Sequence, residues 1–138
     1  MARQDHRGRK RYVGDSFVQV LRATLKEPAW QDMTYGARCL YIALKAHYVG
    51  DNNGRVFLGV RRAANELAAN RESTARWFRE LEAHGFIVQT ERGVLGVEGK
   101  GMAACWRLTE LGCMGQQPTR DYKKWASDKN KTLSGKSS

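Results

Sequence analysis

The sequence predicts one mainly α-helical domain that closes with a small β-hairpin, a fold of the α+β class. Its 138 residues, 41% of them hydrophobic, are enough to fill one modest core. Apolar residues recur at helical spacing through residues 34–48 and 70–84. After Gly85, two short apolar segments flank a stretch that holds four glycines, which is typical of a hairpin with a glycine-rich connection.

The first part of the chain predicts two helices. Asp15 or Ser16 is suited to cap a helix over residues 17–27, which Pro28 ends. Thr34 opens a second helix, in which apolar residues spaced i, i+3, i+4, i+7 and i+11 predict a buried face: Ala37, Leu40, Tyr41, Leu44 and Tyr48.

The second part begins at GDNNG, residues 50–54, which favours a turn with positive φ. Asn70 is suited to cap the longer of two helices that follow, and Gly85 is suited to end it. The predicted elements are, in order, a strand at 56–58, a helix at 60–68, a helix from Asn70 to about His84, and strands at 86–90 and 105–109.

The net charge of +10 lies mostly at the two ends of the chain. Residues 1–15 hold +3 and residues 120–138 hold +4, which leaves +3 for the rest. Basic ends suit a polyanion, because each phosphate contact releases a counterion; solubilising tails are the alternative. We therefore divide the chain into a basic N-terminal arm (1–15), a domain (16–109) and a basic C-terminal extension (110–138), with disorder expected from about residue 127.

Several classes of protein and site are excluded by what the sequence lacks. No apolar run approaches the roughly 18 residues of a membrane span, and the charged N-terminus is unlike a secretory signal, so we expect a cytoplasmic, nucleoid-associated protein. The three cysteines, Cys39, Cys105 and Cys113, lack zinc-ligand spacing, so we expect structural thiols and no metal or cofactor. No nucleotide-binding or hydrolase motif is present, and we expect no enzyme. A small nuclease with carboxylates far apart in the sequence is the alternative.

The segment Arg61–Ile87, RRAANELAANRESTARWFRELEAHGFI, carries the most information. Its two short helices around a brief turn and its ending, E-L-E-x-x-G-F-I, resemble the helix-turn-helix of bacterial GntR-like and MarR-like winged-helix regulators. With Asn52-Asn53-Gly54 and VFLG the resemblance covers residues 34–109, and the layout is similar to small phage-, plasmid- and mobile-element-borne proteins. It implies a winged helix-turn-helix fold that binds double-stranded DNA. The 29 residues after Thr109 are too few for a domain that senses a small molecule.

Three residues depart from the family pattern. Ala68 stands in the turn where glycine is usual, so we expect the turn to avoid positive φ there. Thr74 replaces a core valine, and Ala75 stands where a DNA-facing basic residue is common in the GntR-like group.

Polar and charged residues of the second helix predict the DNA contact. If its apolar residues (Thr74, Trp77, Phe78, Leu81) face the core, the helix start and outer side present Asn70, Arg71, Ser73, Arg76 and Arg79. Arginines at the start of such a helix bind guanine O6 and N7 in the major groove. Arg61 and Arg62, in the preceding helix, are placed to bind phosphates. The alternative is a solvated face held by pairs such as Glu72–Arg76.

Two further regions are candidate contacts with the minor groove. The hairpin connection, residues 92–101, offers Arg92 and Lys100; a merely flexible hairpin is the alternative. The N-terminal arm offers Arg7, Arg9, Lys10 and Arg11. At the other end, residues 119–125 predict a short helix that docks through Tyr122 and Trp125 on the body or on a second protomer.

These features favour a sequence-specific double-stranded-DNA-binding protein that regulates transcription, as a repressor, on a bacterial mobile element. A plasmid or phage replication or recombination accessory protein that binds repeated sites is the alternative, and a protein-interaction module with incidental charge is a third. We expect neither a membrane nor a small-molecule partner. A homodimer formed through the 40–48 helix or through Tyr122 and Trp125 stays open.

Overall fold

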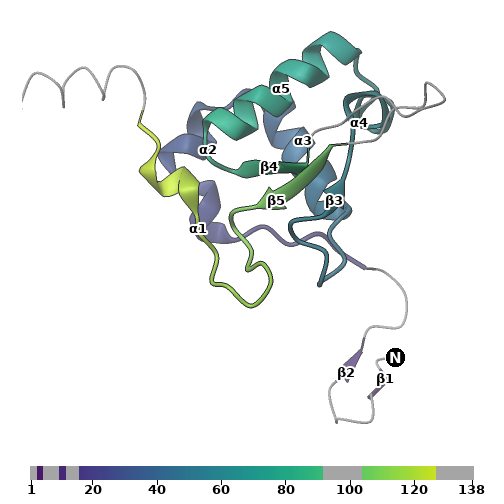
Figure 1. Ribbon diagram of the computed structural model, residues 1–138, viewed down its shortest axis with the longest axis vertical. Coiled ribbons are helices and arrows are strands. Elements are labelled where there is room, and N and C mark those ends of the chain that lie inside the picture. Colours follow the sequence, from purple (N-terminus) through teal and green to yellow (C-terminus); the bar gives the residue numbers. More distant parts are fainter. Residues whose placement is uncertain (1–2, 5–9, 12–15, 92–103, 127–138) are drawn as a thin grey trace, which may run out of the picture.

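The computed structural model describes residues 3–4, 10–11, 16–91 and 104–126 (Figure 1). Within these residues the chain forms an α+β body in which helices cover one face of a small antiparallel sheet. No helix of this described part is long and apolar enough to cross a membrane. The elements of the body are α1 (Arg22–Leu25), α2 (Pro28–Asp32), α3 (Tyr35–Ala46), β3 (Val56–Phe57), α4 (Val60–Leu67), α5 (Arg71–Ala83), β4 (Ile87–Glu91), β5 (Cys105–Leu108) and the 3-10 helix η1 (Asp121–Lys124).

The sheet has three strands in the order β3–β5–β4, and both pairs are antiparallel. Val56 lies opposite Trp106 and Ile87 lies opposite Leu108, and all four side chains are buried. These four side chains belong to the core that the helices cover. The three predicted strands are confirmed to within one residue at each end, whereas the predicted hairpin connection at residues 92–101 lies outside the described residues.

Helix α3 has the cap and the buried face that the sequence predicts. Thr34 Oγ1 accepts a hydrogen bond from the Ala37 N–H at 3.3 Å. Ala37, Leu40, Tyr41 and Leu44 are fully buried, and Tyr48 lies half-buried just after the helix. Trp30 of α2 meets the Tyr41 ring edge-on, with the ring centroids 5.7 Å apart, so it belongs to the same core.

The turn at residues 50–54 is confirmed, with φ of 107° at Gly50 and 93° at Gly54. Asn53 is buried within it and is bonded to the far end of the sheet. Its Oδ1 accepts the Leu108 N–H at 2.7 Å, and its Nδ2 donates to the carbonyl oxygens of Leu108 and Leu111. The turn is therefore locked to β5.

The helix predicted over residues 17–27 is confirmed only for Arg22–Leu25, and its predicted first part is wrong. Leu21 has an extended backbone, with φ of −67° and ψ of 138°, and α1 begins only at Arg22. Lys45 of α3 donates to the Gln19 carbonyl oxygen at 2.9 Å, which holds the preceding segment in a non-helical course. A helix this short is marginal by itself, so such tertiary contacts decide the outcome. Pro28, which was expected to end that helix, is the first residue of α2. At this position a residue needs no N–H for a hydrogen bond within the helix, so proline is tolerated.

A buried polar cluster ties the N-terminal part of the body to the segment after β5. Glu110, which no sequence pattern marked, forms a buried ion pair with Lys45 and accepts a hydrogen bond from the Thr24 hydroxyl. The Tyr41 hydroxyl donates to Glu110 Oε1 at 3.0 Å. Burial, together with the charge of Glu110, raises the pKa of Tyr41 well above its usual range. Because a buried charge must be paired, these groups hold α1, α3 and residue 110 in one arrangement.

Residues 119–125 dock on the body, one of the two alternatives expected from the sequence. Tyr122 of η1 is buried and stacks on Phe86, with ring centroids 4.7 Å apart and planes 10° apart. Gly85 makes this contact possible: it has φ of +85°, and a Cβ there would lie 2.7 Å from the backbone of Asp121. The residues beyond 126, for which disorder was predicted, lie outside the described residues.

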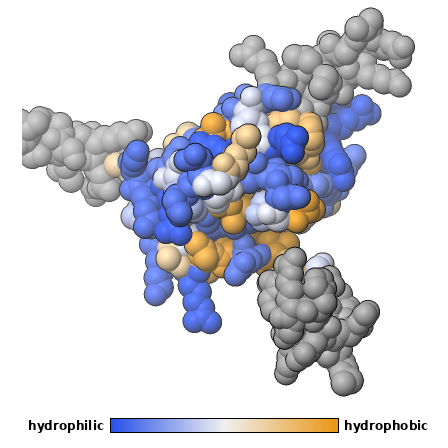
Figure 2. All heavy atoms as spheres, turned by 60° about the horizontal axis from the view of Figure 1, so that its bottom comes forward, coloured by the Kyte–Doolittle hydropathy of each residue, from blue (hydrophilic) through white to orange (hydrophobic). Residues whose placement is uncertain are grey.

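Some apolar side chains stay exposed where the described body begins. Phe17 and Val18 line a cavity of about 190 Å³ together with Tyr48 and Leu111. In Figure 2, orange side chains gather in the lower part of the face, and most of the remaining coloured surface is blue.

Candidate nucleic-acid interface

Helices α4 and α5 are joined by three residues, 68–70, and the first of them has an unexpected conformation. Ala68 has φ of 53° and ψ of 44°, so the turn takes the left-handed conformation that we expected it to avoid. The Ala69 N–H then donates to the Ala64 carbonyl oxygen at 2.9 Å, which closes the end of α4. A left-handed conformation costs a residue with a Cβ about 1–2 kcal/mol. The short connection between two packed helices imposes it nonetheless.

The start of α5 is capped as predicted. Asn70 Oδ1 accepts the Ser73 N–H at 2.7 Å, and the Thr74 hydroxyl donates to the Asn70 carbonyl oxygen at 2.8 Å. These bonds fix the first turn of the helix and the direction in which its side chains leave it.

The two sides of α5 differ in burial as the sequence predicts. Thr74, Phe78 and Leu81 are buried, and Trp77 is half-buried against Gly36 of α3. Arg71, Arg76 and Arg79 are exposed, and Arg76 Nη2 donates to the Ser73 hydroxyl at 3.1 Å. Within the described residues no ion pair joins Glu72 to Arg76, the pairing that the alternative of a solvated face invoked.

Two of the carboxylates on these helices are engaged inside the molecule. Glu80 Oε2 accepts the Thr34 N–H at 2.6 Å and its Oε1 accepts the Thr34 hydroxyl at 2.8 Å, so Glu80 holds the residue that caps α3. Glu66 lies 3.0 Å from both His47 Nε2 and Arg62 Nε. Sequence reasoning missed these roles, because the Thr34–Glu80 and His47–Glu66 contacts join residues far apart in the chain. Both carboxylates are therefore held by partners inside the molecule.

The first turn of α4 holds the two predicted phosphate ligands, and they differ. Both Arg61 and Arg62 are exposed. Arg62 forms the i,i+4 ion pair with Glu66, whereas Arg61 has no such pair with any residue that the structure describes. Arg61 is therefore the freer cation of the two.

The remaining predicted contacts lie largely outside the described residues. Arg7, Arg9, Arg92 and Lys100 are not among them. Lys10 and Arg11 form β2 (Lys10–Arg11), which pairs with β1 (Arg3–Gln4) and places Arg3 opposite Arg11.

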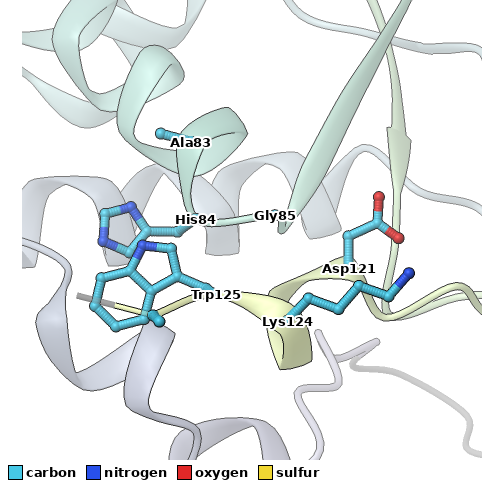
Figure 3. Close-up of a pocket in the computed structure, with 7 residues that line it drawn as sticks. Ala83, His84, Gly85, Asp121, Lys124 and Trp125 are labelled. Atoms are coloured by element: carbon cyan, nitrogen blue, oxygen red, sulfur yellow. The ribbon is translucent and has the colours of Figure 1, made fainter. Parts of the chain in front are cut away.

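A hollow of about 240 Å³ lies at the far end of α5, between His84 and η1 (Figure 3). The His84 ring is stacked on Trp125, with centroids 4.8 Å apart. Its Nε2 is 2.8 Å from Asp32 Oδ2, and its Nδ1 is 2.8 Å from the Glu80 carbonyl oxygen. With both nitrogens engaged, the ring has no free ligand atom and serves to anchor η1. Across the described part of the chain, no group of three His, Cys, Asp or Glu side chains is placed to hold a metal ion.

Comparisons with known proteins were made at three levels. No family model, no curated protein and no solved structure matches the chain.

Proposed function

We propose that this chain is a winged helix-turn-helix protein that binds specific double-stranded-DNA sequences through α5 and represses transcription on a bacterial mobile element. One observation carries the proposal: α5, held behind α4 by a three-residue turn, exposes Arg76 and Arg79 on the side away from the core and Arg71 at its first position. Binding alone, without catalysis, then blocks access of a polymerase to the site.

The order of the elements supports this fold. Helix α3 is followed by the short strand β3, then by α4 and α5, and finally by the antiparallel strands β4 and β5. A helix fits the major groove of B-DNA, which is about 12 Å wide. With the buried side of α5 turned to the core, the opposite side is the one available to a duplex.

The exposed residues of α5 suit both recognition of DNA bases and binding of DNA phosphates. Arg71 lies in the first turn of α5, where free N–H groups and the helix dipole also favour a phosphate. Arg76 and Arg79 lie further along and are long enough to reach base edges, where guanine O6 and N7 accept two bonds from one guanidinium. Exposed Glu72 is suited to accept from cytosine N4 or to orient an arginine. Arg61 adds a phosphate contact from α4.

The first experiment is selection of bound duplexes from a randomised DNA pool at two salt concentrations. An enriched inverted repeat with half-sites about 10 bp apart supports a regulator that binds as a dimer with two-fold symmetry. Enriched tandem direct repeats support the replication or recombination role instead. If nothing is enriched and binding vanishes as salt rises, the affinity is nonspecific and the proposal is overturned.

A pair of matched double variants then tests whether α5 is the reading element. Arg71→Gln with Arg76→Gln is expected to weaken binding to the selected site at least about 30-fold, because each base-reading arginine contributes about 1–3 kcal/mol. The control is Arg22→Gln with Lys26→Gln, which removes the same charge from exposed positions at α1. Equal losses in the two variants, or none in the first, would show that α5 does not read the sequence.

A further inference from the structure

One arginine of α5 is held in a fixed direction by a neighbouring hydroxyl. Arg76 Nη2 donates to the Ser73 hydroxyl at 3.1 Å, from one turn further along the same side of the helix. Ser73 is itself fixed, because its N–H donates to Asn70 Oδ1 at 2.7 Å in the N-terminal cap. Among the residues that the structure describes, Arg71 and Arg79 form no side-chain hydrogen bond or ion pair. Arg76 is therefore the arginine of α5 whose direction is set before any DNA is bound.

The group that holds Arg76 is neutral, so the charge of the guanidinium stays available to DNA. Two carboxylates, Glu72 and Glu80, stand four residues before and four residues after it on the same helix. Glu80 is bonded to the start of α3, and in the described part of the chain no ion pair joins Glu72 to Arg76. Arg62 of α4 differs in this respect, since its partner Glu66 carries a negative charge.

A guanidinium held in this way still has two parallel hydrogen bonds to offer to one base. Its planar fork contains two side-by-side pairs of N–H groups, Nε with Nη2 and Nη2 with Nη1. Nη2 contributes one hydrogen to each pair, so the bond to Ser73 leaves the other pair complete. Guanine O6 and N7 accept such a pair in the major groove. Because the side chain is already oriented, binding costs less of its conformational entropy.

We propose that Ser73 is a positioning residue that orients Arg76 toward one guanine of the bound site, and that this pair determines specificity at that position. The assignment rests on the proposed function and names the base that α5 recognises there. Arg76 lies about 7.5 Å along the helix axis from Arg71, so it reaches the groove beyond the phosphate favoured at the helix start. Ser73, which the sequence suggested as a direct DNA contact, acts through the arginine instead.

Binding to the selected duplex and to its single-base-pair variants tests the role of Ser73. Ser73→Ala keeps the N–H that Asn70 caps and introduces a good helix former, so the variant is expected to fold. It is expected to lower discrimination at one guanine position at least about fivefold and to leave affinity for a duplex of scrambled sequence unchanged. Ser73→Thr keeps the hydroxyl and is expected to retain most of the discrimination. Ser16→Ala, the same change at an exposed position outside α5, is the control and is expected to behave as wild type.

A double-mutant cycle separates positioning from direct contact with DNA. If Ser73 acts through Arg76, Ser73→Ala has no further effect on discrimination once Arg76→Gln is present. Equal losses with and without Arg76→Gln would mean that Ser73 contacts the DNA itself, and they overturn the proposal. It is also overturned if Ser73→Ala discriminates as wild type does, or if Ser73→Thr loses as much as Ser73→Ala.

Nuclear magnetic resonance of the arginine side chains tests the same assignment in the full chain without DNA. The Nε–H of Arg76 is expected to have a higher order parameter than those of Arg71 and Arg79, and Ser73→Ala is expected to lower it to their level. Equal order of the three side chains in wild type overturns the positioning role, even where the α5 variants still lose DNA binding. Failure to select any duplex, by contrast, withdraws the proposed function and this assignment with it.

Discussion

Single residues in this chain are under different constraints from those that their types suggest. Ala68 adopts a left-handed conformation, which glycine adopts without strain, because the chain must pass from α4 to α5 in three residues. Asn70, two residues later in the same turn, is by contrast well suited to its role as the cap of α5. The turn therefore holds one favourable residue and one strained residue.

Replacing Ala68 by glycine is expected to stabilise the fold. Relief of about 1–2 kcal/mol of strain exceeds the about 0.4–1 kcal/mol lost to the freer unfolded chain, for a net gain of roughly 0.5–1 kcal/mol. Urea unfolding measures this change in the free energy of unfolding. Ala75→Gly, in the middle of right-handed α5, is the control and is expected to lose about 1 kcal/mol. Destabilisation by both changes would contradict the strain at Ala68.

At the scale of elements, the position of α5 depends on a contact with the start of α3. Glu80 of α5 accepts two hydrogen bonds from Thr34, and Trp77 packs on Gly36 one turn away. A carboxylate at a helix N-terminus is also favoured by the helix dipole. The candidate DNA-reading helix is thus bonded, through Glu80, to Thr34, the residue that caps its neighbour.

Glu80→Gln is expected to destabilise the protein by about 1 kcal/mol, because a charged acceptor at the α3 N-terminus becomes a neutral one. Chemical denaturation gives the value. Glu82→Gln, on an exposed position of the same helix, removes the same charge and is expected to have little effect. Equal effects of the two substitutions would mean that the contact with Thr34 contributes nothing measurable.

For the whole molecule, the buried polar cluster around Glu110 is the feature that joins the most distant segments. It connects α1 and α3 to the chain after β5, beside the docked η1. Burial also raises the pKa of Tyr122, so two tyrosines of the core hold their protons more firmly in the folded state. The fold therefore contains groups whose ionisation opposes folding.

The free energy of unfolding is expected to fall as the pH rises above about 10, the ordinary pKa of tyrosine. Below that pH the folded and unfolded states bind the same tyrosine protons; above it the unfolded chain loses a proton that folded Tyr41 keeps, so stability declines. Tyr41→Phe is expected to show a shallower decline than Tyr35→Phe, which alters an exposed ring. Denaturant unfolding along a pH series checks this, and identical slopes would refute the assignment to Tyr41.

The sequence by itself determined the elements whose signals are local. Periodicity and caps predicted α3 and α5, and short apolar segments beside turn residues and glycines predicted the turn and the three strands, because contacts within a few residues produce these signals. The exposure of Arg76 and Arg79 followed from the same helical spacing, whereas Arg71 is exposed as the first residue of α5. Only the tertiary structure decided the non-helical course before Arg22, the conformation of Ala68, and the engagement of Glu66 and Glu80. Each of these depends on partners distant in the chain or on the closing of a turn between packed helices, and no local pattern of residues encodes such contacts.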